Sequence, residues 1–388
     1  MIRTFVIAAS TAALAACTAT DGPTEIPGSR APEVSLPEIS TPTPSNTVPV
    51  LTERPLSGVH AWSNGFGLRY EGGWRDGEFH GDGTLEEPDG RRYSGAWVDG
   101  KRDGEGRQSH PNGTYYDGEW VLNQPFGAGT RKRLDGNRLS GQWRGARITN
   151  GLLTLWSGHT YAGPIQSDGR PGFSTRLIAW LEGLSRDGDA AAQSLLGRWL
   201  LSEAATATNR QTALSWVQRA AEQGDASAQL ALAGELAPAE RNAWLERAAD
   251  QQHPTALHQL ALAQLERGRC REAQQTFEAA IRQGSIESRL ALARHLATTT
   301  AGCGADPARA VSLARDIAIT TGQWHYLDTL AAGYARQKAF GQAIDAATAA
   351  LARATAAGVD PQRLEELQRR VSLYEQQQPY VDPAQEYP

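Results

Sequence analysis

Two patterns of apolar and polar positions divide this chain, predicting strands in the first half and helices in the second. The first half repeats an aromatic-x-Gly-x-Trp block every 23 residues, at Tyr70–Trp74, Tyr93–Trp97 and Tyr116–Trp120, with a degraded copy at Leu139–Trp143. Alternate residues of a strand share a face, so the aromatic, glycine and tryptophan of each block point the same way. Asp-Gly turns follow the blocks. The pattern predicts an antiparallel ribbon of hairpins, whose central glycines leave room for an aromatic ring from the next unit.

From about residue 174, apolar residues recur at three- and four-residue spacing, which predicts helices. Gly188-Asp189-Ala190 is echoed by Gly224-Asp225-Ala226 36 residues later, so the helices also form repeats. Asp360 and Pro361 fit the cap and first position of a final helix that reaches about Gln377. We expect roughly five helical pairs and this capping helix, stacked as a solenoid with a concave groove.

Both halves resemble known repeat families. The Tyr-x-Gly-x-Trp blocks and their glycine turns are similar to MORN repeats, and the second half resembles Sel1-like repeats that drift toward the tetratricopeptide (TPR) form near Trp324 and Tyr334. The resemblance implies a multidomain repeat protein (β then α), with an antiparallel β-hairpin ribbon of MORN repeats followed by an α-solenoid of Sel1-like/TPR helical pairs. We expect the ribbon at residues 56–165 and the solenoid with its capping helix at 174–377.

The first residues resemble a bacterial lipoprotein signal. Arg3 and a short apolar run precede Leu14, Ala15, Ala16 and Cys17, a tripeptide and cysteine that resemble the lipobox. The resemblance implies removal of residues 1–16 and acylation of Cys17 with chains such as palmitate, which together anchor stably to a membrane. Thr18, in place of an aspartate, favours the outer membrane. A plain signal peptide with an incidental cysteine is the alternative.

Two segments lack the composition of a folded core. Residues 17–55 are rich in proline, threonine and serine and sparse in large apolar residues, which predicts a disordered tether behind the lipid anchor. Residues 378–388 are expected to form a disordered tail, in which Tyr380 and Tyr387 could form a short epitope.

The two remaining cysteines follow equivalent turns of the helical half. Cys270 and Cys303 lie between predicted helices of neighbouring pairs, which stack on each other. In an oxidising periplasm we expect a Cys270–Cys303 disulfide. Two independent free thiols are the alternative, because a disulfide tolerates only a short Cα separation.

Charge and motif content argue against nucleic-acid binding and catalysis. The net charge is only −5, which steers no strongly charged partner. His253 and His258 are five residues apart, which does not fit helical metal pairs, and the sequence carries no nucleophile elbow or phosphate loop. We therefore expect no enzyme activity, no metal and no cofactor.

Two functions remain open. The first is a lipid-anchored scaffold or adaptor at the bacterial outer membrane, facing the periplasm, whose solenoid groove near Tyr334 binds envelope proteins during assembly or export. The second is a module that binds peptidoglycan or polysaccharide through an aromatic ladder that includes Trp74, Trp97 and Trp120. The alternative for those rings is that they form the core of the ribbon, since a single-layer sheet has little other apolar material.

Overall fold

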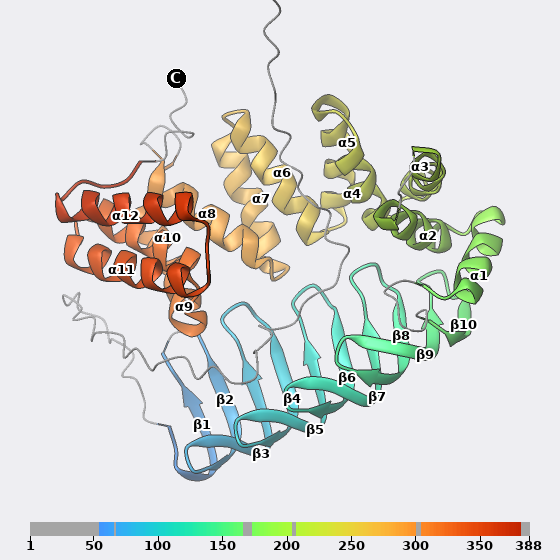
Figure 1. Ribbon diagram of the computed structural model, residues 1–388, viewed down its shortest axis with the longest axis horizontal. Coiled ribbons are helices and arrows are strands. Elements are labelled where there is room, and N and C mark those ends of the chain that lie inside the picture. Colours follow the sequence, from blue (N-terminus) through green and yellow to red (C-terminus); the bar gives the residue numbers. More distant parts are fainter. Residues whose placement is uncertain (1–53, 66, 166–172, 204–206, 300–303, 382–388) are drawn as a thin grey trace, which may run out of the picture.

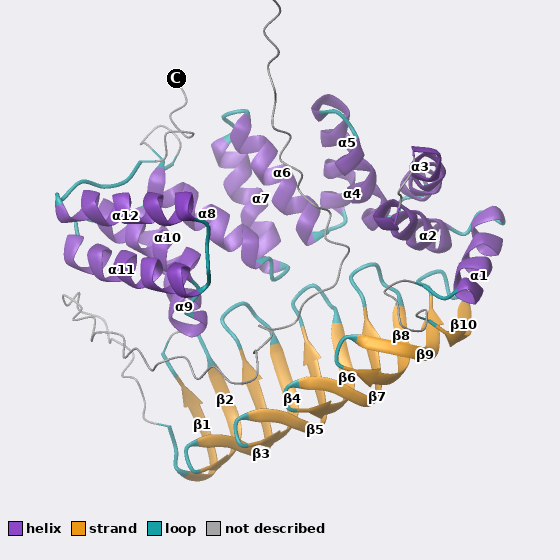
Figure 2. Ribbon diagram, in the orientation of Figure 1, coloured by secondary structure: helices purple, strands orange, loops and turns teal. Residues whose placement is uncertain are grey.

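The computed structural model describes residues 54–65, 67–165, 173–203, 207–299 and 304–381. Within them, a β ribbon is followed by an array of helices that runs back along it (Figure 1). The β10 end of the ribbon adjoins α1, and the β1 end lies near the last helices. Figure 2 shows that strands and helices occupy separate layers.

The ribbon is a single antiparallel sheet whose strands neighbour each other in chain order. Its strands are β1 (Ser57–Ser63), β2 (Arg69–Arg75), β3 (Glu78–Glu86), β4 (Arg92–Val98), β5 (Lys101–Ser109), β6 (Tyr115–Val121), β7 (Gln124–Lys132), β8 (Arg138–Arg144), β9 (Arg147–Thr154) and β10 (Thr160–Pro164). Asp76 and Gly77 turn β2 into β3 with φ of 52° and 77°, as a hairpin turn with two left-handed residues requires. The predicted hairpin ribbon is confirmed.

The aromatic ring beside the central glycines is not the one that we expected. Gly72 and Gly83 face each other across β2 and β3, and a Cβ on Gly72 would lie 2.4 Å from the Gly83 Cα. A Cβ on Gly83 would lie 2.1 Å from the hydroxyl oxygen of Tyr70. The ring that occupies the gap therefore belongs to the same repeat, not to the next, because strand pairing brings the two glycines of one hairpin together.

The helices form stacked pairs between a linking helix and a capping helix. They are α1 (Thr175–Arg186), α2 (Ala190–Glu203), α3 (Ala207–Glu222), α4 (Ala226–Glu235), α5 (Pro238–Asp250), α6 (Pro254–Glu266), α7 (Cys270–Arg282), α8 (Ile286–Thr298), α9 (Pro307–Thr321), α10 (Trp324–Arg336), α11 (Phe340–Ala356) and α12 (Pro361–Glu375). Consecutive helices pack together from α2 to α11 as five pairs. The predicted solenoid is confirmed, and α1 is an additional helix that links it to β10.

The last helix, α12, begins at the residues that the sequence predicts. Asp360 caps α12 by accepting a hydrogen bond from the Arg363 N–H, and Pro361 occupies the first turn. The helix ends at Glu375, two residues before the expected end. Tyr380, expected in the disordered tail, is only 9% exposed, so this part of the tail is packed.

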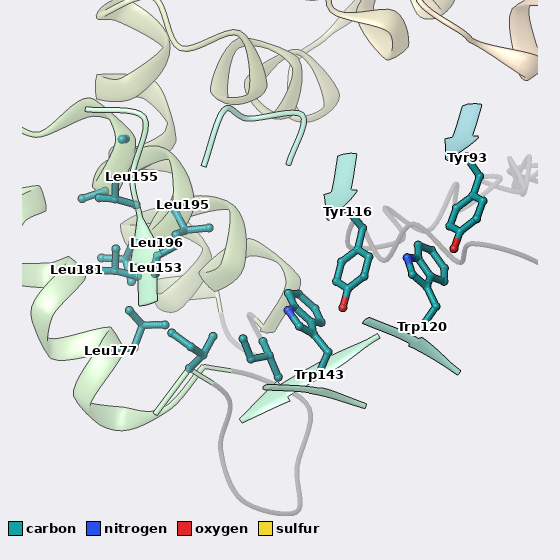
Figure 3. Close-up of a cluster of buried hydrophobic side chains, with 14 of the residues drawn as sticks. Tyr93, Tyr116, Trp120, Trp143, Leu153, Leu155, Leu177, Leu181, Leu195 and Leu196 are labelled. Atoms are coloured by element: carbon teal, nitrogen blue, oxygen red, sulfur yellow. The ribbon is translucent and has the colours of Figure 1, made fainter. Parts of the chain in front are cut away.

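One apolar core joins the two layers at the β10 end. The aromatic rings of the ribbon continue through Ile148 and Leu153 to Leu177 of α1 and Leu196 of α2 (Figure 3). The ribbon and the first helices are therefore packed as one body.

Candidate functional site

The aromatic ladder forms the interior of the ribbon. Its tyrosines and tryptophans are 1–4% exposed and meet edge to face, as Tyr93 does with Trp97 and with Trp120 of the next repeat, at centroid distances of 5.0 and 5.5 Å. Each tryptophan also donates its Nε1–H to a carbonyl of the preceding repeat, with Trp97 to Gly83 at 3.2 Å as an example. Burial raises the pKa of Tyr70 to about 12, since the phenolate would lose hydration, and a nearby Asp82 adds to the effect.

Arginines cover rings of the ladder. The guanidinium of Arg54 lies 5.6 Å from the ring centroid of Trp62, Arg102 lies 4.4 Å from Trp120, and Arg131 lies 4.7 Å from Trp143. These are cation–π contacts within the fold. They take up ring surface that a sugar would need for stacking.

Four side chains suggested as contacts for a glycan or a partner are buried. Trp74 is 4% exposed and Trp97 and Trp120 are 3% exposed, so they belong to the core of the ribbon. Tyr334 of α10 is 9% exposed and packs in the buried cluster that α10 forms with α9, α11 and α12, where burial raises its pKa. Their apolar rings are the material from which both layers build their cores, so they offer little surface for direct contact.

The structure instead brings together two sets of residues that the sequence left separate. The turns that end the second strand of each ribbon hairpin form one long edge of the ribbon, which faces the helical array (Figure 1). The starts of α2, α4, α6, α8 and α10 lie near these turns. We call this the turn–helix interface. Its turns lie at residues 87–91, 110–113, 133–137 and 155–158.

Two capping aspartates have a second role in this interface. One carboxylate oxygen of Asp225 caps α4 by accepting from the Ala228 N–H at 2.7 Å, and the other accepts from Trp156 Nε1–H at 3.0 Å. Asp189 caps α2 in the same way, and its second oxygen lies 2.9 Å from His159 Nδ1. The Gly-Asp-Ala motif therefore both starts a helix and holds a ribbon turn.

A buried ion pair ties the third turn to α2. Asp135, whose side chain is 3% exposed, lies 2.8 Å from the guanidinium of Arg198 and 3.5 Å from that of Arg133. Burial alone would raise the pKa of Asp135, but Arg133 and Arg198 outweigh it, and the pKa lies below its usual value. The two arginines therefore favour the ionised form of the carboxylate.

The first two turns meet the later helices. A Cβ on Gly284, just before α8, would lie 3.0 Å from Pro111 of the second turn. The charges of Asp89 and Arg91 act on Tyr326 of α10, and Asp316 of α9 lines a groove with Glu87 of the first turn. The interface thus runs along most of the ribbon.

The predicted cysteine chemistry is only partly within the described residues. Cys270 is disulfide-bonded. Cys303 lies outside those residues, but its neighbour Gly304 accepts a hydrogen bond at 3.4 Å from Gln274, one turn after Cys270. The pairing of Cys270 with Cys303 stays a prediction. The lipobox residues Leu14, Ala15, Ala16 and Cys17 also lie outside the described residues.

The described ranges hold no group of three or more His, Cys, Asp or Glu side chains that could bind a metal ion. None of the helices in these ranges has the length and apolar character that crossing a membrane requires.

Comparisons with known proteins address the two repeat arrays separately. The family model described as "MORN repeat" matches residues 70–90, 93–115 and 116–138. A Sel1 repeat protein from Oxalobacter formigenes is 20% identical with a TM-score of 0.38, covering 51% of this chain and 97% of its own. A protective antigen of uropathogenic Escherichia coli with an SLR fold is 21% identical with a TM-score of 0.36, covering 54% of this chain and 50% of its own. The curated proteins give no match. The ribbon is thus built on MORN repeats at residues 70–138, and a helical repeat array follows it.

Proposed function

We propose that the protein is a scaffold or adaptor lipoprotein, anchored through Cys17 to the bacterial outer membrane and facing the periplasm. Its helical array binds partner proteins of an envelope assembly or export process. The lipobox-like residues before Cys17 and the proline-rich segment after it support the anchored position. Repeat arrays in general present extended surfaces to partners.

The turn–helix interface is the observation that carries the proposal. The buried Asp135 and the helix-capping Asp189 and Asp225 bind the ribbon to the array. Their carboxylates are therefore engaged in structural contacts and do not line a reactive cleft. The ladder rings are buried too, which disfavours a glycan module. The ribbon therefore supports the helical surface, and a rigid helical surface suits protein binding better than catalysis.

The best-suited contact surface lies on α3 and α5. Trp216 and Trp244 occupy equivalent, partly exposed positions, and the guanidinium of an arginine one turn later lies over each ring, at 5.0 Å for Arg219 and 4.5 Å for Arg247. Tryptophan and arginine are the residue types most enriched at binding hot spots. This surface, which we call the Trp/Arg stripe, replaces the groove around Tyr334 as the proposed partner site.

The test is purification of the lipidated protein from gently crosslinked native envelopes. Arg219→Glu with Arg247→Glu reverses exposed charges on the stripe without touching the core, and Lys101→Glu, exposed on the ribbon, is the matched control. Cys17→Ser tests the need for the anchor. A near-stoichiometric protein lost only with the double variant supports the proposal. Recovery of cell-wall or polysaccharide fragments alone, unaffected by the double variant, would overturn it in favour of glycan binding.

A further inference from the structure

The last helix covers a buried polar cluster that the scaffold proposal does not use. Arg370 of α12 donates from Nη1 to Asp328 Oδ2 of α10, and both side chains are 5% exposed. Tyr374, one turn after Arg370, is fully buried beside them. An ion pair this deep is held by specific partners, because burying either charge alone is costly.

The chain closes this cluster with its own C-terminal segment. After α12 ends at Glu375, the backbone turns, with the Gln378 N–H donating to the Leu373 carbonyl at 2.9 Å. Tyr380 then lies over Arg370, with the guanidinium 4.2 Å from the ring centroid, and joins the buried cluster of α10 to α12. We call the surface formed by Asp328, Arg370 and Tyr374 the C-terminal seat.

Tyr380 covers the C-terminal seat but forms no hydrogen bond with three of its polar atoms. Asp328 Oδ1, Arg370 Nε and the Tyr374 hydroxyl are buried and have no hydrogen-bond partner within the described part of the chain. Buried polar atoms left unpaired cost free energy that a better-matched ligand recovers. The described part of the tail, which ends at Val381, is therefore a weak occupant, held by ring contact and by its attachment to α12.

We propose that the C-terminal seat is a binding site for an extended peptide of a partner protein, one that brings an aromatic ring followed by a hydrogen-bond acceptor. The ring takes the place of Tyr380 over Arg370. The acceptor pairs with Arg370 Nε and the Tyr374 hydroxyl, which have no hydrogen-bond partner among the residues that the structure describes. The chain's own tail competes for the seat, so a partner must displace it. This site is separate from the Trp/Arg stripe, and neither proposal depends on the other.

Competition with the chain's own tail determines how much removal of the tail should increase the affinity for a free peptide. A segment attached next to its site acts at an effective concentration in the millimolar range, so removing it increases the apparent affinity for a free peptide by on the order of tenfold or more. Replacing the ring alone, as in Tyr380→Ala, opens the seat and keeps the rest of the tail.

The experiment measures fluorescence polarisation of a labelled peptide that spans residues 376–388. The proteins are the full chain, the chain ended after Gln378, and the full chain with Tyr380→Ala; Tyr387→Ala is the matched control. We expect the truncated and Tyr380→Ala proteins to bind the peptide at least about tenfold more tightly than the full chain and the control. A peptide carrying Tyr380→Ala should not bind.

Three results would overturn the proposal. One is equal binding by all four proteins, and another is no binding by a Tyr380→Ala protein whose circular dichroism shows it to be folded. The third is a dimer of the full chain, seen by size-exclusion chromatography and lost with Tyr380→Ala, since the occupant would then be the tail of a second copy.

Discussion

His253 links acid stability to the turn–helix interface. It precedes α6, is 7% exposed, and its Nδ1 has no hydrogen-bond partner within the described ranges. Burial, and then the positive charge of Arg198, lower the pKa of His253 to about 4, against the weaker opposing influence of Asp135. The folded protein therefore keeps this imidazole neutral at pH values where an unfolded chain protonates it.

The sign and size of the effect follow from linkage. Between the unfolded pKa near 6.5 and the folded pKa of about 4, the unfolded state binds more protons, so the free energy of unfolding falls as the pH falls. The full shift corresponds to roughly 3 kcal/mol, of which about 2.5 kcal/mol is lost between pH 7.5 and pH 4.5. Above about pH 7 the contribution is complete and constant.

The variant His253→Asn removes the titration and places a good capping residue at the start of α6. Urea unfolding at pH 7.5, 5.5 and 4.5, followed by circular dichroism of the helices, should show the wild type losing about 2.5 kcal/mol relative to the variant. His60→Asn, an exposed histidine on β1, is the control. A difference between wild type and His253→Asn that stays constant across this pH range would refute the reasoning, as would a ring pKa above 6 in an NMR titration.

Three further substitutions test the packing. Gly106→Ala places a Cβ 2.1 Å from the hydroxyl oxygen of Tyr93 and should lower the free energy of unfolding by about 2 kcal/mol or more in urea titrations; an unchanged midpoint would contradict the packing. Trp156→Phe removes the hydrogen bond to Asp225 and should cost about 1 kcal/mol, with faster proteolysis between ribbon and array, whereas unchanged cleavage would mean that this contact is not needed. Cys270→Ser should lower stability by about 2–4 kcal/mol, as reductant should in the wild type, and peptide mapping without reductant identifies its partner.

Much of the fold could be predicted because its causes are local. The ribbon depends on a repeated block and on turns whose residues accept left-handed backbone, as Asp99 and Gly100 do with φ of 48° and 75°. The start of α12 could likewise be predicted from Asp360 and Pro361. The ring beside the central glycine Gly72 was assigned to the wrong repeat, because it depends on which residue lies across the hairpin, and strand register fixes that, not composition.

The turn–helix interface could not be predicted, because each of its contacts joins residues far apart in two arrays with different repeats. Trp156 and Asp225 are 69 residues apart, and Asp135 and Arg198 are 63 apart. The sequence indicated Asp225 only as part of the repeated Gly-Asp-Ala motif, because a carboxylate oxygen that binds a distant residue leaves no sequence pattern.

Distances between strands and between helices explain how ribbon turns and helix starts can meet along the interface although the two arrays have different repeat lengths. Two paired strands advance the ribbon by about 9.6 Å, and packed helices lie about 8–10 Å apart. The helix starts that meet the ribbon turns follow this advance, although the ribbon block is 23 residues long and α2, α4, α6, α8 and α10 begin 36, 28, 32 and 38 residues apart. Because the match is in distance and not in residues, the array can vary its loops while each ribbon turn keeps a partner, and the helical surface stays braced along the ribbon.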